Sequence, residues 1–237
     1  MTQFIRKLFF PDKRGLVIGG SGALGTAIVS RFKKGWEMTS VDFSVNREAK
    51  FNIQLEPDHD VQKQADLVEK GLSGKYDFIV STAGAWSQGD ISEKNVFSQF
   101  EMNLRANMYP SLIAGHLASK FLTETGIVVF TGSLLSFKEN TPGMLAYGVS
   151  KNLVHSLALN LSTRKELISE NTVICILPDI LNTEVNRKAM PGADFSKWTS
   201  PDKIAEVIFM WNKGVNTPKN GSFVAFKGEK ELTQEYL

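Results

Sequence analysis

Near its start the chain reads Gly15-Leu16-Val17-Ile18-Gly19-Gly20-Ser21-Gly22-Ala23-Leu24-Gly25, an apolar run that leads into glycines. The segment 20–25 fits G-x-G-x-x-G, whose glycines permit a tight turn and a close approach of the backbone to a pyrophosphate. Apolar residues at helical spacing follow over 23–34, so the first N–H groups of a helix would face the same anion. We therefore expect all seven residues from 19 to 25 to contact a dinucleotide. The competing interpretation is a tight strand-to-helix turn that binds nothing.

Segments with the patterns of strands and helices alternate along the whole chain. Apolar or β-branched runs predict strands at residues 15–18, 38–43, 51–55, 76–82, 127–130, 173–177 and 222–226. Helical spacing predicts helices at 23–34, 61–72, 92–122, 145–167 and 201–211, the third of them kinked or divided near Pro110. Strands that alternate with helices pair in parallel through right-handed crossovers. We therefore expect an α/β fold with one Rossmann-like, doubly wound domain over residues 1–237, a parallel sheet covered by helices on both faces, and an N-terminal extension over 1–13.

Residues 182–200 differ from their surroundings because they are rich in Pro, Gly, Asp and Asn. A long segment between a strand and a helix is either disordered or functional. This one also contains Met190, Phe195 and Trp198, which a disordered spacer would not need. We interpret it as an insertion that covers a substrate. Met190 and Trp198 are its candidate substrate contacts, and anchoring of the loop to the core is their alternative role.

The bulk composition argues against several classes of protein. Apolar residues make up 42% and charged residues 22% of the chain, which are ordinary values for a globular protein. The net charge is +2 and no dense Lys/Arg run occurs, so we expect no nucleic-acid partner. No apolar run approaches the roughly 18 residues of a membrane helix. The start lacks the continuous apolar core of a signal peptide.

The cysteine and histidine content indicates neither a disulfide nor a metal. Cys175 is the only cysteine and lies in an apolar strand pattern, so we expect an inert core thiol. The setting is then reduced, and we expect a cytoplasmic protein. His59, His116 and His155 are scattered along the chain without metal-ligand spacing, so we expect no metal.

Asp42 ends the second predicted strand, 20 residues after Gly22. A carboxylate at this position accepts hydrogen bonds from an adenosine ribose and repels a 2′-phosphate, which favours NADH over NADPH. Arg47 is close enough in sequence to reach a 2′-phosphate, so NADPH is the alternative cofactor. A structural role for Asp42, as the cap of a turn at the end of the strand, is the competing interpretation.

Tyr147-Gly148-Val149-Ser150-Lys151 carries a phenol and an ammonium four residues apart, on one face of the predicted helix 145–167. Beside a nicotinamide, such a pair can donate a proton while the cofactor donates a hydride. Tyrosine titrates near pH 10, and we expect the Lys151 ammonium and the oxidised nicotinamide to lower the pKa of Tyr147 towards neutrality. Lys151 can also bind the nicotinamide ribose. The Y-x-x-x-K pattern is common by chance, but its occurrence in the same chain as the glycine loop favours an active site.

Together these features resemble the short-chain dehydrogenase/reductase family over most of the chain. The resemblance implies a cofactor-binding turn at Ser81-Thr82-Ala83-Gly84, where Ala83 and Gly84 contact the cofactor. It also implies contacts from Pro178 and Thr183 to the nicotinamide amide. Two positions depart from the family pattern, because Asp179 replaces a Gly and Ala23 stands at the middle Gly of the family's glycine motif.

The same resemblance implies the catalytic set. Tyr147 and Lys151 are its central pair, and both also contact the cofactor. Ser133 is the candidate for the catalytic serine, although it precedes Tyr147 by 14 residues, one or two more than is usual in the family. Asn103 matches the helix asparagine of the family's proton relay.

A narrower resemblance is to the dihydropteridine reductase branch of this family. The residues that carry it are Thr141-Pro142-Gly143-Met144, the segment 186–199, and the ending Glu231-Leu232-Thr233. This resemblance implies NADH-dependent reduction of quinonoid dihydrobiopterin to tetrahydrobiopterin. It also implies a homodimer, formed through the helices around 92–122 and 145–167. In that branch the catalytic Ser and the helix Asn are often missing, which leaves Tyr and Lys as the chemical pair.

Trp86 directly follows Ala83-Gly84-Ala85 and would project near the nicotinamide end of the sheet. A flat heterocycle needs a stacking surface, so we nominate Trp86 as a pterin contact, with a surface or packing role as the alternative. Two other functions compete with pterin reduction. One is NADPH-dependent reduction of carbonyls or quinones on the same scaffold. The other is NADH sensing without catalysis, which the presence of both Tyr147 and Lys151 disfavours.

Overall fold

The computed structural model describes residues 13–164, 170–228 and 230–234, so the predicted N-terminal extension lies outside the described residues except for Lys13. The strands in these ranges are β1 (Lys13–Ile18), β2 (Trp36–Asp42), β3 (Phe51–Gln54), β4 (Tyr76–Ser81), β5 (Leu122–Thr131), β6 (Thr172–Pro178), β7 (Ser222–Lys227) and β8 (Lys230–Gln234). They form one sheet in the order β3-β2-β1-β4-β5-β6-β7-β8. All neighbours from β3 to β7 pair in parallel, and β8 pairs antiparallel with β7.

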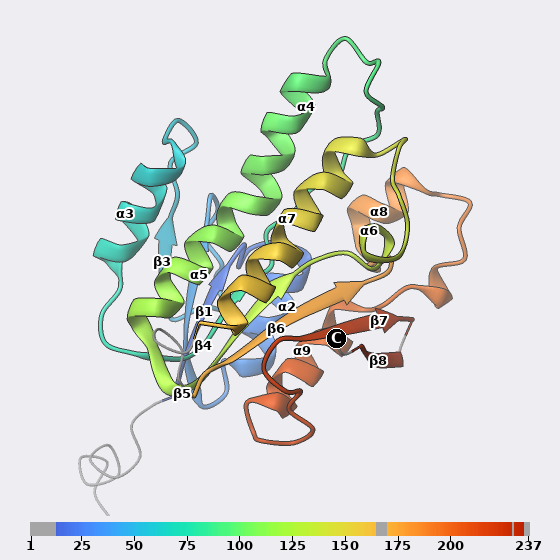
Figure 1. Cartoon of the computed structure of the whole chain (residues 1–237). Coiled ribbons are helices and arrows are strands. Elements are labelled where there is room, and N and C mark those ends of the chain that lie inside the picture. The colour runs from blue at the N-terminus through green and yellow to red at the C-terminus, as the bar shows by residue number, and fades with distance from the viewer. Residues whose placement is uncertain (1–12, 165–169, 229, 235–237) are drawn as a thin grey trace, which may run out of the picture.

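Helices cover both faces of the sheet (Figure 1). The α-helices in the described ranges are α2 (Ala23–Phe32), α3 (Val61–Gly71), α4 (Val96–Asn103), α5 (Tyr109–Phe121), α6 (Leu134–Lys138), α7 (Leu145–Ser162), α8 (Glu184–Ala189) and α9 (Pro201–Trp211). In Figure 1, α3, α4, α5 and α7 lie in front of the sheet, and α2 and α9 lie behind it. The predicted fold class, a single Rossmann-like α/β domain, is therefore confirmed.

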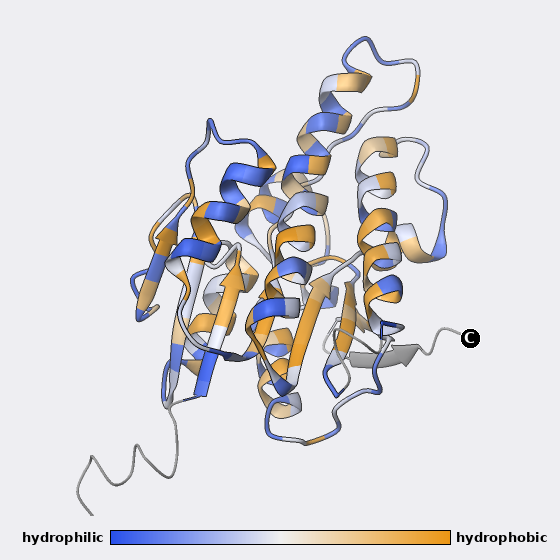
Figure 2. Ribbon diagram, turned by 60° about the vertical axis from the view of Figure 1, so that its left-hand side comes forward, coloured by the Kyte–Doolittle hydropathy of each residue, from blue (hydrophilic) through white to orange (hydrophobic). Residues whose placement is uncertain are grey.

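Two apolar cores lie on the two faces, because successive strand residues point to opposite sides of the sheet. Leu16 of β1 belongs to the core under α5 and α7, together with Ile113 and Val154. Its neighbour Val17 belongs to the core under α2 and α9. The central strands are apolar along most of their length (Figure 2), as strands buried on both faces must be.

The predicted helix 92–122 differs most from what was observed. Helix α4 begins at Val96, and a π-helical turn, η1 (Leu104–Met108), separates α4 from α5. Pro110 lies in the first turn of α5, where a missing N–H costs nothing, and Tyr109 N–H donates to the Leu104 carbonyl five residues earlier. The division predicted near Pro110 is therefore confirmed, and its form is a π turn.

Three further features depart from the predictions: an additional strand, an additional helix and the end of α7. The prediction that 222–226 is the last strand is wrong, since β8 follows after a turn at Gly228. Helix α6 was not predicted, and it begins where the Ser133 side chain accepts the Ser136 N–H. Helix α7 ends at Ser162, short of the predicted end at 167, and residues 165–169 lie outside the described ranges.

The insertion 182–200 is more regular than its composition suggested. It contains α8 and a 3-10 turn, η2 (Phe195–Lys197). Its ends are tied together, because Asn182 N–H donates to the Thr199 carbonyl at 2.8 Å and Thr199 N–H donates to the Ile180 carbonyl at 2.9 Å. These hydrogen bonds bring the two ends of the insertion together. Within the described ranges, no helix has both the length and the hydrophobicity that a membrane crossing requires.

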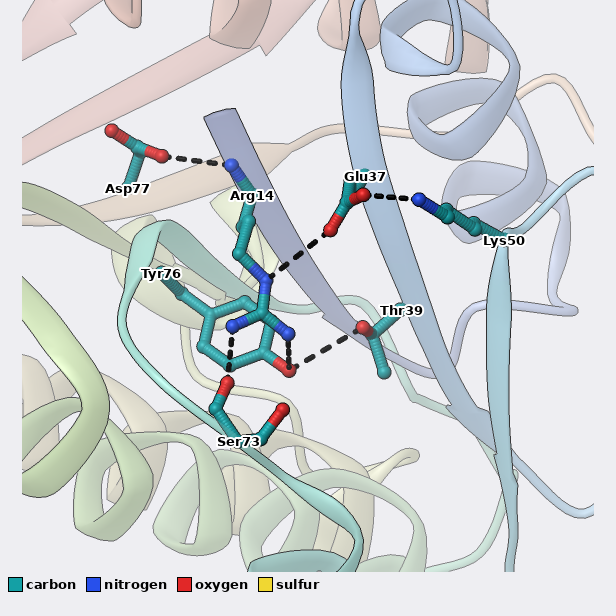
Figure 3. Close-up of polar contacts among 7 residues, drawn as sticks. All are labelled: Arg14, Glu37, Thr39, Lys50, Ser73, Tyr76 and Asp77. Carbon is teal, nitrogen blue, oxygen red and sulfur yellow. Dashed lines mark hydrogen bonds and ion pairs between the residues drawn. The ribbon is translucent and has the colours of Figure 1, made fainter. Parts of the chain in front are cut away.

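Arg14 joins the amino ends of three strands (Figure 3). Its guanidinium stacks on the Tyr76 ring, 4.4 Å from the ring centroid, and donates to the Tyr76 hydroxyl at 3.2 Å. Its backbone N–H donates to Asp77 Oδ2 at 2.8 Å, and Glu37 Oε2 lies 3.8 Å from its Nε. The side chain therefore links β1 to both β2 and β4, at the end of the sheet opposite the carboxyl ends of the strands.

Candidate active site

A cleft of about 1060 Å³ opens at the carboxyl ends of the parallel strands. The glycine loop after β1, Asp42 at the end of β2, the turn after β4 and the end of β5 line it. Tyr147 and Lys151 of α7 also line it, as do Pro178 at the end of β6 and Thr183 after that strand. Ligands of open parallel sheets bind in this position, outside the carboxyl ends of the strands.

The glycine loop fits a pyrophosphate because its glycines leave no room for side chains. A Cβ at Gly25 would lie 2.1 Å from the Gly19 carbonyl oxygen, and a Cβ at Gly20 would lie 2.3 Å from Ser40 Oγ. Gly19 also has a φ of 83°, which favours glycine. Gly22 caps α2 without a side-chain hydrogen bond, so the first N–H groups of that helix are free to bind an anion.

Not every residue of the loop reaches the cleft. Its wall includes Gly19, Ser21, Gly22, Ala23 and Leu24. The other two predicted residues are not part of this wall: Gly25 packs against the Gly19 carbonyl, and Gly20 packs against the Ser40 side chain.

Asp42 lines the cleft and also holds the glycine loop. Its Oδ2 accepts the Ser21 N–H at 2.9 Å, and Ser21 Oγ donates to the Ser44 carbonyl at 2.6 Å. Asn46 is buried and donates to the Gly20 carbonyl at 2.6 Å, which makes it a further support of the loop. Arg47 is exposed and is not among the residues that line the cleft.

Tyr147 and Lys151 lie on one face of α7, as their spacing predicted. Lys151 is 5% exposed, and its Nζ donates to the Thr131 carbonyl at 2.9 Å. A Cβ added at Gly84 would lie 3.2 Å from Lys151 Nζ, so the bare backbone after β4 faces the ammonium. Ala83, Gly84, Tyr147 and Lys151 therefore share one end of the cleft.

Burial shifts the titration of both side chains. Burial raises the pKa of Tyr147, and a hydrogen bond with Ser133 acts in the opposite direction. In this structure the desolvation of the phenolate outweighs the hydrogen bond with Ser133. The lowering expected from the Lys151 ammonium together with the oxidised nicotinamide stays a prediction for the protein with its cofactor bound. Burial lowers the pKa of Lys151 to about 8, so its ammonium form prevails at neutral pH.

Ser133 lies at the start of α6, beneath the cleft wall. It is buried, its Oγ accepts the Ser136 N–H at 3.4 Å, and it hydrogen-bonds Tyr147. The longer spacing between Ser133 and Tyr147 therefore does not keep the two side chains apart. The structure brings together all three members of the predicted catalytic set.

The asparagine that adjoins this set is Asn107, which the sequence reasoning missed. Asn107 is fully buried in the π turn, accepts the Ala85 N–H at 3.1 Å and donates to the Ala85 carbonyl at 3.0 Å. A Cβ at Gly84 would lie 3.0 Å from its Oδ1. Asn103, the predicted residue, lies one turn earlier and donates to Ser87 Oγ at 2.8 Å. Asn103 was chosen because it matches the family pattern, and no sequence pattern singled out Asn107.

Trp86 lies in the cleft wall and reaches the insertion. Its Nε1 donates to Asn186 Oδ1 at 3.1 Å, and Asn186 Nδ2 donates to the Leu181 carbonyl at 2.9 Å. Asn186 lines the cleft as well and was not predicted as a site residue. The indole and α8 are thus joined across the opening of the cleft.

The other two predicted substrate contacts do not line the cleft. Trp198 is buried against Phe195, with ring centroids 4.7 Å apart. Met190 is half-buried at the end of α8. In this structure Trp198 anchors the insertion, which was the alternative role considered for it.

The far end of the cleft contains polar groups without a protein partner among the described residues. His59 Nδ1 and Gln64 Oε1 are buried and unpaired, and both residues line the cleft beside Asp60, the cap of α3. Unpaired buried polar atoms are rare in proteins and indicate a ligand, a water or strain. No sequence pattern singled out these residues.

The structure points neither to a reactive thiol at Cys175 nor to a metal site among the residues that it describes. Burial raises the pKa of Cys175 to about 12, which leaves an unreactive thiol. In the part of the chain that the structure describes, no group of three or more His, Cys, Asp or Glu side chains is arranged to hold a metal.

Comparisons with known proteins identify the family. The model of the short chain dehydrogenase family matches residues 13–194. The chain is 34% identical over 227 residues to a dihydropteridine reductase from Dictyostelium discoideum, covering 94% of this chain and 97% of that protein. A short chain dehydrogenase family protein from Francisella tularensis subsp. tularensis SCHU S4 superposes with a TM-score of 0.76 at 20% identity, covering 91% and 97% of the two chains. BdcA in complex with NADPH superposes with a TM-score of 0.76 at 22% identity over 92% and 93%. The chain therefore belongs to the short-chain dehydrogenase family of NAD(P)-dependent oxidoreductases.

Proposed function

We propose that this protein is an NADH-dependent reductase of quinonoid dihydropteridines, with Tyr147 as the proton donor. The observation that carries the proposal is that Tyr147, Lys151 and Trp86 line the same cleft. The 34% identity to a dihydropteridine reductase over 94% of the chain supports the substrate class. The product of the reaction is the tetrahydropterin.

The cleft has the features that a dinucleotide requires. The glycine loop and the free N–H groups of α2 would hold the pyrophosphate, and Asp42 would accept hydrogen bonds from the adenosine ribose. Ala83, Gly84, Pro178 and Thr183 would surround the nicotinamide end. When bound, NADH supplies the hydride of the reaction.

Tyr147 would supply the proton. Its raised pKa keeps the phenol protonated at neutral pH, which is the form that a proton donor needs. The hydrogen bond with Ser133 orients the phenol, and the Lys151 ammonium stabilises the phenolate that proton donation leaves behind. Solvent then returns the proton to Tyr147.

The walls of the cleft suit a flat, polar substrate. Trp86 offers an aromatic face, and the hydrogen bond from its indole to Asn186 fixes the orientation of that face. We assign 182–200 as the segment that covers the substrate, with α8 next to the opening and Met190 at the end of that helix. Trp198 would support this segment from the core side.

We propose a homodimer formed through α4, α5 and α7. These helices run side by side (Figure 1), and they expose apolar side chains to solvent. Leu112 of α5 is 43% exposed and Leu153 of α7 is 41% exposed. If these helices form the dimer interface, Leu153→Glu should sediment as a monomer in sedimentation velocity. Val215→Glu, a substitution at a comparably exposed site after α9, should remain a dimer. A wild-type monomer at micromolar concentration would refute the assembly.

The function is tested by NADH oxidation with quinonoid dihydropterin, followed at 340 nm for the wild type and Tyr147→Phe. We expect turnover by the wild type and a loss of at least about a hundredfold for the variant. Parallel reactions use NADPH, and use simple carbonyls and quinones in place of the pterin. Negligible pterin turnover beside rapid reduction of a carbonyl or quinone would overturn the substrate assignment and favour the alternative reductase.

A further inference from the structure

His155 continues the face of α7 that carries the proposed catalytic pair. Tyr147, Lys151 and His155 follow one another at four-residue spacing, so they lie along one side of the helix. His155 is 6% exposed and packs against the rings of Phe137 and Phe223, with centroid distances of 5.6 and 5.8 Å. The mechanism proposed above uses the first two members of this row and gives the third no task.

The third member binds the same backbone segment as the second. Lys151 Nζ donates to the Thr131 carbonyl at 2.9 Å, and His155 Nε2 accepts the Ser133 N–H at 3.2 Å. Between these two bonds, a Cβ at Gly132 would lie 2.3 Å from His155 Nε2, so the ring packs directly on the bare glycine. The turn after β5 is therefore fixed from α7 by one donor and one acceptor.

Acceptance by Nε2 requires a neutral imidazole that carries its proton on Nδ1. Burial lowers the pKa of His155 to about 4, and the charge of Lys151 acts in the same direction. The ring partners Phe137 and Phe223 are apolar. The acceptor is thus present throughout the neutral range of pH.

We propose that His155 is a positioning residue for the proton-transfer step, which holds the Ser133 backbone so that the Ser133 side chain meets the phenol of Tyr147. The inference rests on the proposed role of Tyr147 as the proton donor. His155 acts through Ser133, and it does not contact the reacting atoms.

The test compares two substitutions of similar size. His155→Gln keeps an acceptor close to the position of Nε2, whereas His155→Leu fills the space without one. We expect His155→Leu to lower kcat about tenfold, the value of one well-placed hydrogen bond, with the KM for NADH changed less than about twofold. His155→Gln should retain at least about a third of the wild-type kcat. Circular dichroism and NADH fluorescence confirm that each variant is folded and binds cofactor.

A double-mutant cycle with Ser133→Ala separates positioning from a general structural effect. If His155 acts through Ser133, then His155→Leu costs less than about twofold once Ser133 is already alanine. Independent, multiplying effects would overturn the proposal, as would equal losses for the Leu and Gln variants or an unchanged kcat in His155→Leu. If His155→Leu does not fold, a folded His155→Gln with a tenfold loss overturns the proposal, and one with near wild-type kcat supports it.

The Tyr147→Phe variant distinguishes a failure of the His155 proposal from a failure of the proposed function. Turnover by Tyr147→Phe at the wild-type rate would refute the proton donor and, with it, the basis for His155. An inactive Tyr147→Phe beside a fully active His155→Leu would refute the role of His155 alone.

Discussion

Asp42 Oδ2 accepts the Ser21 N–H at 2.9 Å, so the residue proposed to select the cofactor also holds the loop proposed to bind its pyrophosphate. Two substitutions of Asp42 distinguish its role in cofactor selection from its role in holding the loop. Asp42→Asn keeps an acceptor for Ser21 but removes the charge that repels a 2′-phosphate. We expect Asp42→Asn to lower the preference for NADH over NADPH about tenfold, which corresponds to about 1.4 kcal/mol of solvent-screened repulsion between like charges.

Asp42→Ala removes the acceptor as well. Its KM for NADH should rise further than that of Asp42→Asn, since the loop loses its tie to β2. The measurement is kcat/KM with each cofactor for the three proteins. An unchanged ratio in both variants would remove Asp42 from the selection of cofactor.

Lys151→Met should stabilise the protein while it abolishes activity. Burial lowers the pKa of Lys151 from 10.5 to about 8, so the folded state disfavours the charged form that the unfolded chain keeps. The wild type therefore becomes more stable as the pH rises from about 8 to 10.5, and at pH 7 it bears the full penalty. Removing the charge should raise the free energy of unfolding by up to about 3 kcal/mol, less about 1 kcal/mol for the lost bond to Thr131.

Urea unfolding at pH 7 measures this gain, with Lys34→Met as the control. Lys34 is exposed, and its substitution should change the stability by less than about 0.5 kcal/mol. A Lys151→Met protein less stable than the wild type would mean that the bond to Thr131 outweighs the burial of the charge.

Activity should fall on the alkaline side. Since the pKa of Lys151 lies at about 8, its ammonium is lost above that pH, together with its support of the phenolate. We expect kcat/KM for NADH to decrease above pH 8 with a slope of one proton. Lys151→Arg stays charged at every accessible pH, so the activity that it retains should not decrease above pH 8 in this way. A wild-type profile that is flat to pH 9.5 would contradict the assignment.

The sequence predicted the order of the main strands and helices well, because most strands from β1 to β7 contain a short apolar run and each long helix repeats its apolar residues regularly. It failed where the deciding contact joins distant residues. The family pattern pointed to Asn103, and the contact of Asn107 with Ala85 became visible only in the fold. The rise that burial causes in the pKa of Tyr147 was also not predicted, because burial is a property of the fold and not of the Y-x-x-x-K motif.

The contacts of Arg14 at the amino ends of the strands should affect the stability of the protein but not its activity. Arg14 joins β1 to Tyr76 and Asp77 of β4 and lies beside Glu37 of β2 (Figure 3). Arg14→Met keeps much of the apolar stem but loses the guanidinium, and we expect a loss of about 1–3 kcal/mol in the free energy of unfolding. Tyr76→Phe, which loses only the hydroxyl contact, should cost about 1 kcal/mol. Chemical denaturation measures both, and kcat of Arg14→Met should equal that of the wild type.

Trp86 has two separable properties, an aromatic face and an N–H that donates to Asn186 at 3.1 Å. Trp86→Phe keeps a ring but loses the donor, whereas Trp86→Ala loses both. If the indole stacks on the pterin, the KM for quinonoid dihydropterin should rise about tenfold in Trp86→Ala and about twofold to threefold in Trp86→Phe, because an aromatic stack contributes about 1 kcal/mol. Asn186→Ala should resemble Trp86→Phe, since each breaks the same hydrogen bond. The KM for NADH serves as the control and should stay within about twofold of the wild type in all three variants. Equal effects of Trp86→Phe and Trp86→Ala would show that the link to Asn186, and not the aromatic face, is what the substrate requires.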